Sequence, residues 1–175
     1  MAKRILILGG ARSGKSAYAE QRAADYDDVC CLVTAWAGDE EMQARIDKHK
    51  ADRPATWHTV ETGRALAEAI IQHDSVERCL LVDCMTLWLC QWLHDESGQP
   101  LPDASLHAAK TALDQAILGT QGTLILIANE IGLGVVPMGA ITRRFVDEAG
   151  WLNQHLARLV DEVWLVTAGI PMRLK

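Results

Sequence analysis

The chain has 175 residues, of which 49% are hydrophobic and 23% are charged, the balance of an ordinary soluble globular protein rather than of a disordered or fibrous one. A chain of this length can bury about two-thirds of its unfolded surface in one core, so we expect a single domain over residues 1–175. The formal charge of -6 argues against a protein held to nucleic acid by general electrostatics, and it favours small-molecule partners.

Cysteine usage and the apolar segments predict a cytoplasmic protein. The five cysteines are odd in number and lack C-x-x-C spacing, which predicts neither a disulfide framework nor a zinc site. The start, MAKRILILGG, is basic and then apolar, but the apolar run is short and ends in glycines rather than at a signal cleavage site. The richest apolar stretch, LLVDCMTLWLCQWL, carries Asp83 and Gln91 and is too short to span a bilayer, so we expect no membrane span.

Strands and helices alternate along the chain. Apolar runs rich in β-branched residues predict strands at residues 4–8, 29–35, 56–61, 78–84 and 123–130. Helical periodicity predicts helices at residues 14–26, 39–50, 63–73, 85–94, 104–119 and 141–160. A last strand begins at Glu162 and folds back as a hairpin at Gly169 and Pro171. Such alternation is typical of βαβ units with a mostly parallel sheet and a site at the carboxyl ends of its strands.

One segment matches a phosphate-binding loop. GGARSGKS fits G-x-x-x-x-G-K-[ST] and lies between an expected strand and an expected helix. Its glycines let backbone N–H groups face the phosphates, Lys15 supplies a point charge, and Ser16 offers a hydroxyl to Mg²⁺. The dinucleotide fingerprint G-x-G-x-x-G is not matched, because Ala11 stands at its second glycine. The residues expected at the nucleotide phosphates are Gly9, Gly10, Ala11, Arg12, Ser13, Gly14, Lys15 and Ser16.

The loop and the alternation together predict a three-layer α/β fold of the P-loop NTPase class, with a RecA-like parallel sheet and a C-terminal antiparallel hairpin. A metal-supporting acid is expected at the end of a neighbouring strand. Asp83 ends the apolar run LLVD, and Glu130 ends LILIANE. The sequence leaves the choice between these two acids open.

The whole chain resembles the bifunctional adenosylcobinamide kinase / adenosylcobinamide-phosphate guanylyltransferase family of cobalamin biosynthesis. A phosphate loop alone occurs in hundreds of activities, whereas a series of motifs in this order is specific to that family. The matching segments are GGARSGKS, TAWAGDEEMQARIDKHKADRPATWHTVE, DCMTLWL, NEIGLGVVP, RRFVDEAGWLNQHLA and DEVWLVTAGIPMRLK.

The resemblance implies two reactions. A nucleoside triphosphate, ATP or GTP, phosphorylates adenosylcobinamide, and GMP from GTP is then transferred to adenosylcobinamide phosphate through a GMP-histidine intermediate. The family pattern R-I-x-x-H falls on Arg45, Ile46 and His49, which identifies His49 as the nucleophile. The cations at residues 45, 48, 50 and 53 would keep this histidine unprotonated and hold the triphosphate. Without the resemblance, the spacing alone favours a solvated histidine on a charged helix face over a nucleophile.

The resemblance also implies further nucleotide contacts and a homo-oligomer, a trimer. The additional nucleotide-contacting residues are Thr34, Ala35, Trp36, Lys50, Ala51, Asp52, Arg53, Glu61 and Asp83. Asn129, Glu130 and Gly132 match a family turn that approaches the site. Trp88, Trp92 and Trp151 could form a surface for the corrinoid or for a subunit, although core packing is the simpler interpretation.

Two other functions were weighed against the two-step transferase. A single-function kinase would use the same loop and Asp83 but would form no covalent nucleotide at His49. A nucleotide-binding switch would hydrolyse slowly and act on a protein partner. The chain has no N-K-x-D guanine-recognition motif and no long polar segment after the phosphate loop, which disfavours the switch.

Overall fold

The computed structural model describes residues 2–35, 53–95 and 97–175. The strands within these ranges are β1 (Lys3–Gly9), β2 (Asp28–Val33), β3 (His58–Glu61), β4 (Arg78–Asp83), β5 (Thr123–Asn129), β6 (Glu162–Thr167) and β7 (Ile170–Arg173). The helices are α1 (Lys15–Ala23), α3 (Leu66–His73), α4 (Met85–Leu93), α5 (Asp103–Gly119) and α6 (Ala140–Leu159). Every strand and helix expected within these ranges is confirmed, and the helix expected at residues 39–50 lies outside them.

The strands form one sheet in the order β3-β2-β4-β5-β1-β6-β7. All neighbours are parallel except β6 and β7, which run antiparallel. The expected hairpin is therefore confirmed, with Ala168 and Gly169 at positive φ in its turn. Pro171, expected at the turn, lies instead within β7 opposite Val166. An edge strand tolerates proline because one side of its backbone needs no partner.

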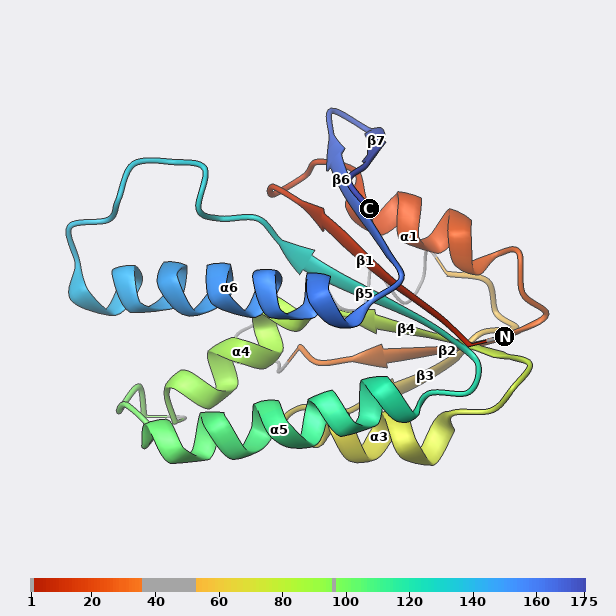
Figure 1. The fold of residues 1–175 in the computed structure, drawn as a ribbon, viewed down its shortest axis with the longest axis horizontal. Helices are drawn as coiled ribbons and strands as arrows, with labels where there is room; N and C mark the ends of the chain where they lie inside the picture. Colours follow the sequence, from red (N-terminus) through yellow and green to blue (C-terminus); the bar gives the residue numbers. More distant parts are fainter. Residues whose placement is uncertain (1, 36–52, 96) are drawn as a thin grey trace.

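Helices lie on both faces of the sheet, which gives three layers (Figure 1). One hydrophobic cluster joins the sheet to α3, α4, α5 and α6, and a second joins the opposite face to α1. The strands between are apolar on both sides, as is usual for parallel strands covered by helices. This arrangement leaves the carboxyl ends of the strands as the edge at which loops can assemble a site.

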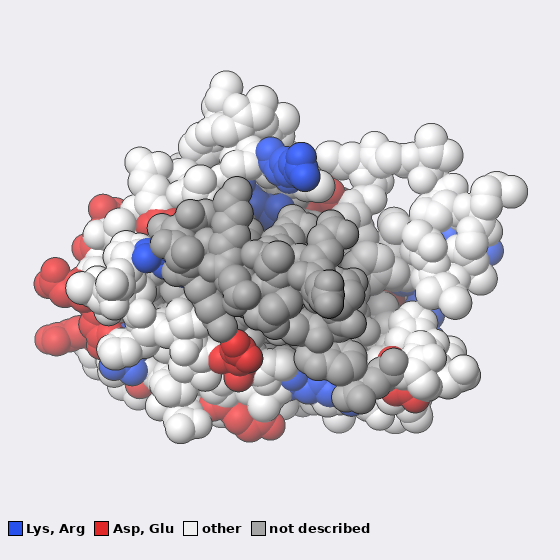
Figure 2. Space-filling model, turned by 180° about the vertical axis from the view of Figure 1, so that it is seen from behind, with Lys and Arg blue, Asp and Glu red and all other residues white. Residues whose placement is uncertain are grey.

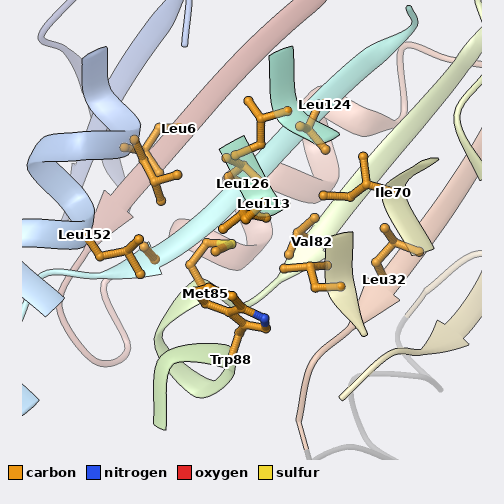
Figure 3. Packing of buried hydrophobic residues seen from close by; sticks show 14 of the residues in the cluster. Leu6, Leu32, Ile70, Val82, Met85, Trp88, Leu113, Leu124, Leu126 and Leu152 are labelled. Carbon is orange, nitrogen blue, oxygen red and sulfur yellow. The ribbon is translucent and has the colours of Figure 1, made fainter. Parts of the chain in front are cut away.

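The larger cluster is centred on leucines of β1 and β5 together with Met85 and Trp88 of α4 (Figure 3). Trp88 is 1% exposed and Trp92 packs against the same cluster, so core packing is the correct interpretation for both. Trp151 is different, because 58% of it is exposed on α6. The expectation of core packing is wrong there, since position 151 lies on the solvent side of an amphipathic helix.

Charge is mixed on the face turned away from the viewer in Figure 1. Acidic side chains gather toward the left-hand edge of that face, and basic side chains occur there in small separate groups (Figure 2). Among the described helices, none combines the length and the apolar character needed to cross a membrane.

Candidate nucleotide site

The predicted phosphate loop connects β1 to α1 at the carboxyl edge of the sheet. Gly14 adopts φ 94 immediately before the helix, and Arg12 adopts φ 55. Such left-handed conformations turn the loop back over the helix N-terminus. Lys15 Nζ donates a hydrogen bond to Gly10 O over 3.1 Å, so its ammonium group lies across the loop. A loop followed by a helix N-terminus, with a cation beside it, is the arrangement that typically binds anions.

The turn between β6 and β7 supports this loop from behind. The N–H of Gly169 donates to Ser13 O over 2.8 Å. A Cβ on Gly14 would lie 3.0 Å from Gly169 Cα, and a Cβ on Gly9 would lie 2.7 Å from Val166 O. Close backbone approach therefore leaves no room for a side chain at either glycine. Sequence reasoning missed this support, and the only local signal for it was the glycine at the turn.

A buried ion pair lies at the carboxyl end of β4. Arg53 Nη2 donates to Asp83 Oδ2 over 2.8 Å, and Arg53 Nε lies 3.4 Å from Glu20 Oε1 on α1. The Arg53 side chain is only 3% exposed. Glu20 was not predicted, although it follows Ser16 by one helical turn and therefore shares its face of α1. The cluster joins the predicted residues Arg53 and Asp83 to the helix that follows the phosphate loop.

Thr34 connects the ends of β2 and β4 through hydrogen bonds. Its buried hydroxyl donates to Cys84 O over 2.6 Å and accepts the Cys84 N–H over 2.9 Å. Gln91 of α4 donates to the Thr34 carbonyl. Burial, together with the negative charge of Asp83, raises the pKa of Cys84 to about 11, so this thiol is not a nucleophile at neutral pH. Ala35, half-buried, follows at the edge of the sheet.

The two remaining acids lie at different distances from the phosphate loop. Glu130 follows β5, and its N–H donates to Gly9 O over 3.0 Å. Its carboxylate accepts the N–H of Gly132 over 2.9 Å. Glu61 ends β3, which β2, β4 and β5 separate from β1, a distance of roughly 19 Å at about 4.8 Å per strand spacing. The structure therefore brings Glu130 to the loop and leaves Glu61 at the far part of the same edge.

Five predicted residues lie outside the described part of the chain, namely Trp36, His49, Lys50, Ala51 and Asp52. The described residues still permit a test of the expected Mg²⁺. They contain no group of three His, Cys, Asp or Glu side chains able to hold a metal alone. Mg²⁺ is usually held by one or two carboxylates together with substrate phosphates. Asp83 at the strand end and Ser16 at the start of α1 fit that mode of binding.

Known proteins resemble this chain along nearly its whole length. The family model described as "Cobinamide kinase / cobinamide phosphate guanyltransferase" matches residues 5–174. The chain is 48% identical over 173 residues to the bifunctional adenosylcobalamin biosynthesis protein CobP of Pseudomonas aeruginosa, covering 98% of this chain and 97% of that protein. It is 37% and 38% identical over 179 residues to the proteins CobU of Escherichia coli and Salmonella typhimurium, with 98% of this chain and 99% of each relative covered.

Proposed function

Because the chain belongs to the cobinamide kinase / cobinamide phosphate guanyltransferase family, we propose that it carries out both reactions of that family's name. In the first, a nucleoside triphosphate, ATP or GTP, phosphorylates the side-arm hydroxyl of adenosylcobinamide. In the second, GMP from GTP is joined to the new phosphate, which gives adenosylcobinamide-GDP and pyrophosphate. The observation that carries the proposal is the phosphate loop between β1 and α1, with Lys15 lying across it.

In the kinase step, the phosphate loop binds the triphosphate by electrostatic attraction. The N–H groups of residues 10–16 and the ammonium of Lys15 hold the triphosphate and balance the charge that develops on the transferred group. Ser16 and Asp83 are the residues that would hold Mg²⁺. The ion would supply Lewis-acid polarisation of the phosphate oxygens. Arg53 keeps the Asp83 carboxylate at the carboxyl edge through its 2.8 Å hydrogen bond.

The guanylyl step uses His49 as the nucleophile. Its unprotonated imidazole attacks the α-phosphorus of GTP, a P–N bond forms, and pyrophosphate leaves. A phosphate oxygen of adenosylcobinamide phosphate then attacks the same phosphorus, and the imidazole leaves. Two features support this proposal. His49 stands in the R-I-x-x-H pattern among four cations, and Arg53, the last of these cations, lies at the carboxyl edge beside Asp83. Thr34, Ala35, Trp36, Lys50, Ala51, Asp52 and Glu61 are proposed as further nucleotide contacts.

The covalent intermediate gives the sharpest test. The purified protein is incubated with Mg²⁺ and GTP labelled in its α-phosphate, denatured, and examined for bound label that is labile in acid and stable in alkali. We expect such label on the wild-type chain and on His58→Ala, a control at an exposed histidine of β3, and none on His49→Ala. Wild-type protein that binds GTP but takes up no label would refute the covalent guanylyl step and favour the single-function kinase.

We further propose that the enzyme is a homo-oligomer, a trimer. Large apolar side chains on the connection between β5 and α6 support this, since Val135 is 96% exposed and Met138 is 95% exposed in one copy. Exposed apolar side chains that lie together commonly mark an interface. Light scattering coupled to size-exclusion chromatography should give three times the 19.2 kDa chain mass. A monomeric mass for the active enzyme would overturn this.

A further inference from the structure

A cleft lies beside the phosphate loop and has no role in the steps described above. Its volume is about 480 Å³, and it is open to the surface along one side. The β5–α6 connection, α6 and the end of the chain form its walls, which are mostly apolar. Its lining includes Glu130, Leu133, Gly150, Gln154, Ala157 and Leu174.

One end of the cleft adjoins the place where the triphosphate would be held. Glu130 lines the cleft, and its backbone N–H is bonded to Gly9, where the phosphate loop begins. Leu8, the preceding residue of β1, lines the cleft as well. A molecule in the cleft would therefore reach the carboxyl edge next to the loop, on the α6 side of the sheet. The helix that follows the phosphate loop, α1, covers the opposite side.

We propose that the cleft is the acceptor site, in which one edge of a corrinoid lies against α6 and its hydroxyl-bearing arm extends to Glu130. This inference rests on the proposed kinase function and adds the position of its second substrate. A corrinoid is much larger than 480 Å³, so an open cleft can hold only an edge of the macrocycle. Leu133, Ala157 and Leu174 offer apolar contact to the ring methyl groups. The exposed amide of Gln154 can pair with the amide arms of the substrate.

Glu130 is then the residue that receives the proton of the acceptor hydroxyl. The hydroxyl oxygen forms a bond to the γ-phosphorus while the bond from that phosphorus to the β,γ-bridging oxygen breaks. The nucleoside diphosphate leaves with the electron pair of that bond, and the hydroxyl proton passes to a Glu130 carboxylate oxygen. The hydrogen bond from the Gly132 N–H fixes this carboxylate in the cleft wall. This assignment gives Asp83 and Glu130 separate tasks.

A helical glycine in the cleft wall allows the cleft to be filled without disturbing the fold. A Cβ at Gly150 would meet no atom within 4 Å, so Gly150→Phe places a ring in the cleft. Gly119 at the end of α5 also has open space around it, and Gly119→Phe is the matched control at the opposite edge of the sheet. Cobinamide is the probe, measured by equilibrium dialysis without nucleotide and by phosphorylation with ATP or GTP.

For Gly150→Phe we expect cobinamide affinity to fall at least tenfold and its KM to rise similarly, with nucleotide affinity within twofold of wild type. Gly119→Phe should match wild type in all three. Unchanged cobinamide affinity and KM in a folded Gly150→Phe protein would overturn the proposal, and so would a change of oligomeric state alone, which would make the cleft an interface. If that variant does not fold, Ala157→Leu serves the same test.

Glu130→Gln keeps the shape of the side chain and its acceptor for the Gly132 N–H. The kcat for cobinamide phosphorylation should fall between about 10²- and 10⁴-fold, the usual contribution of a general base, while cobinamide and nucleotide affinities stay within about threefold. A kcat within threefold of wild type would overturn the role of Glu130. Failure of the wild-type protein to phosphorylate cobinamide would instead refute the proposed function, which separates the two failures.

Discussion

Arg53 and Asp83 are joined by a 2.8 Å hydrogen bond between Nη2 and Oδ2, with the guanidinium almost fully buried. The same guanidinium faces Glu20 on α1. One cation therefore holds together two carboxylates from α1 and from the end of β4. Without Arg53, the two negative carboxylates would lie near each other and partly shielded from water, which is unfavourable.

Replacing Arg53 by Met should therefore destabilise the fold. Removing one partner of a fully buried ion pair is strongly destabilising. Asp83 and Glu20 retain some solvent exposure, so the cost should be smaller here. We expect a loss of about 2 kcal/mol in the free energy of unfolding. Urea denaturation monitored by circular dichroism measures it. The exposed Arg143→Met serves as control. Adding Asp83→Asn to Arg53→Met should recover part of the loss, and strict additivity of the two changes would contradict the pairing.

Replacing Gly10 and Gly14 of the phosphate loop by alanine should have different effects on stability. At Gly14 an added Cβ would be strained at φ 94 and 3.0 Å from Gly169 Cα, which predicts a loss of about 1–3 kcal/mol in unfolding free energy. At Gly10 the Cβ meets no atom within 4 Å, so the change should stay within about 0.5 kcal/mol. Thermal or urea denaturation of both variants without nucleotide measures this. Equal losses would show that the hairpin does not support the loop.

Glu162 should make stability depend on acid pH. Burial alone would raise its pKa, but hydrogen bonds from Lys3, Trp164 and Arg22 outweigh burial and lower the pKa from 4.5 to about 2. A carboxylate with a depressed folded-state pKa adds stability above its unfolded value, and that stability declines as pH falls from about 4.5 toward 2. Glu162→Gln should therefore be less stable than wild type by about 1–2 kcal/mol at pH 7 and by clearly less at pH 3.

The matched control for Glu162 is Glu77→Gln, which changes an exposed glutamate outside any strand or helix. This substitution should leave urea midpoints within error of wild type at both pH values. A Glu162→Gln effect that is the same at pH 3 as at pH 7 would mean that the charge of Glu162 does not stabilise the fold.

The thiols should be unreactive in the native protein. Burial raises the pKa of Cys31 to about 11 and that of Cys79 to about 12, so little thiolate forms at pH 8. Burial also raises the pKa of Cys90, which is the least buried of the five. Mass spectrometry after iodoacetamide treatment should find labelling at Cys90 first, and at all five cysteines only in denaturant. Rapid native labelling of Cys31 or Cys79 would contradict the packing of β2 and β4.

Local sequence patterns were enough to predict the strands, the helices and the phosphate loop. The runs ILIL and LILIA are apolar throughout because β1 and β5 are buried on both faces, and that property is visible in the sequence. The order of the strands is different, because β1 pairs with β5 and β6 from distant parts of the chain. Hydrophobic pattern contains no signal for such long-range pairing.

The site was only partly predictable, because it is built from residues that are far apart in the sequence. Asp83 and Glu130 looked equivalent in sequence, since each ends an apolar strand. Only the fold shows that Glu130 adjoins Gly9, whereas Asp83 is paired with Arg53. The exposed position of Trp151 was also missed, because a tryptophan in an amphipathic helix is usually buried.

The contact between Gly169 and the phosphate loop also bears on synthesis of the chain. Residues 9–16 leave the ribosome early, but Ser13 and Gly14 gain the backbone that supports them only when residues 166–169 have followed. Residues 162–166, which are also made late, pair with the second edge of β1. Domains fold as units while translation proceeds at about 5–20 residues per second. We therefore expect the growing chain to bind a nucleotide only after its last strands have emerged and the sheet is complete.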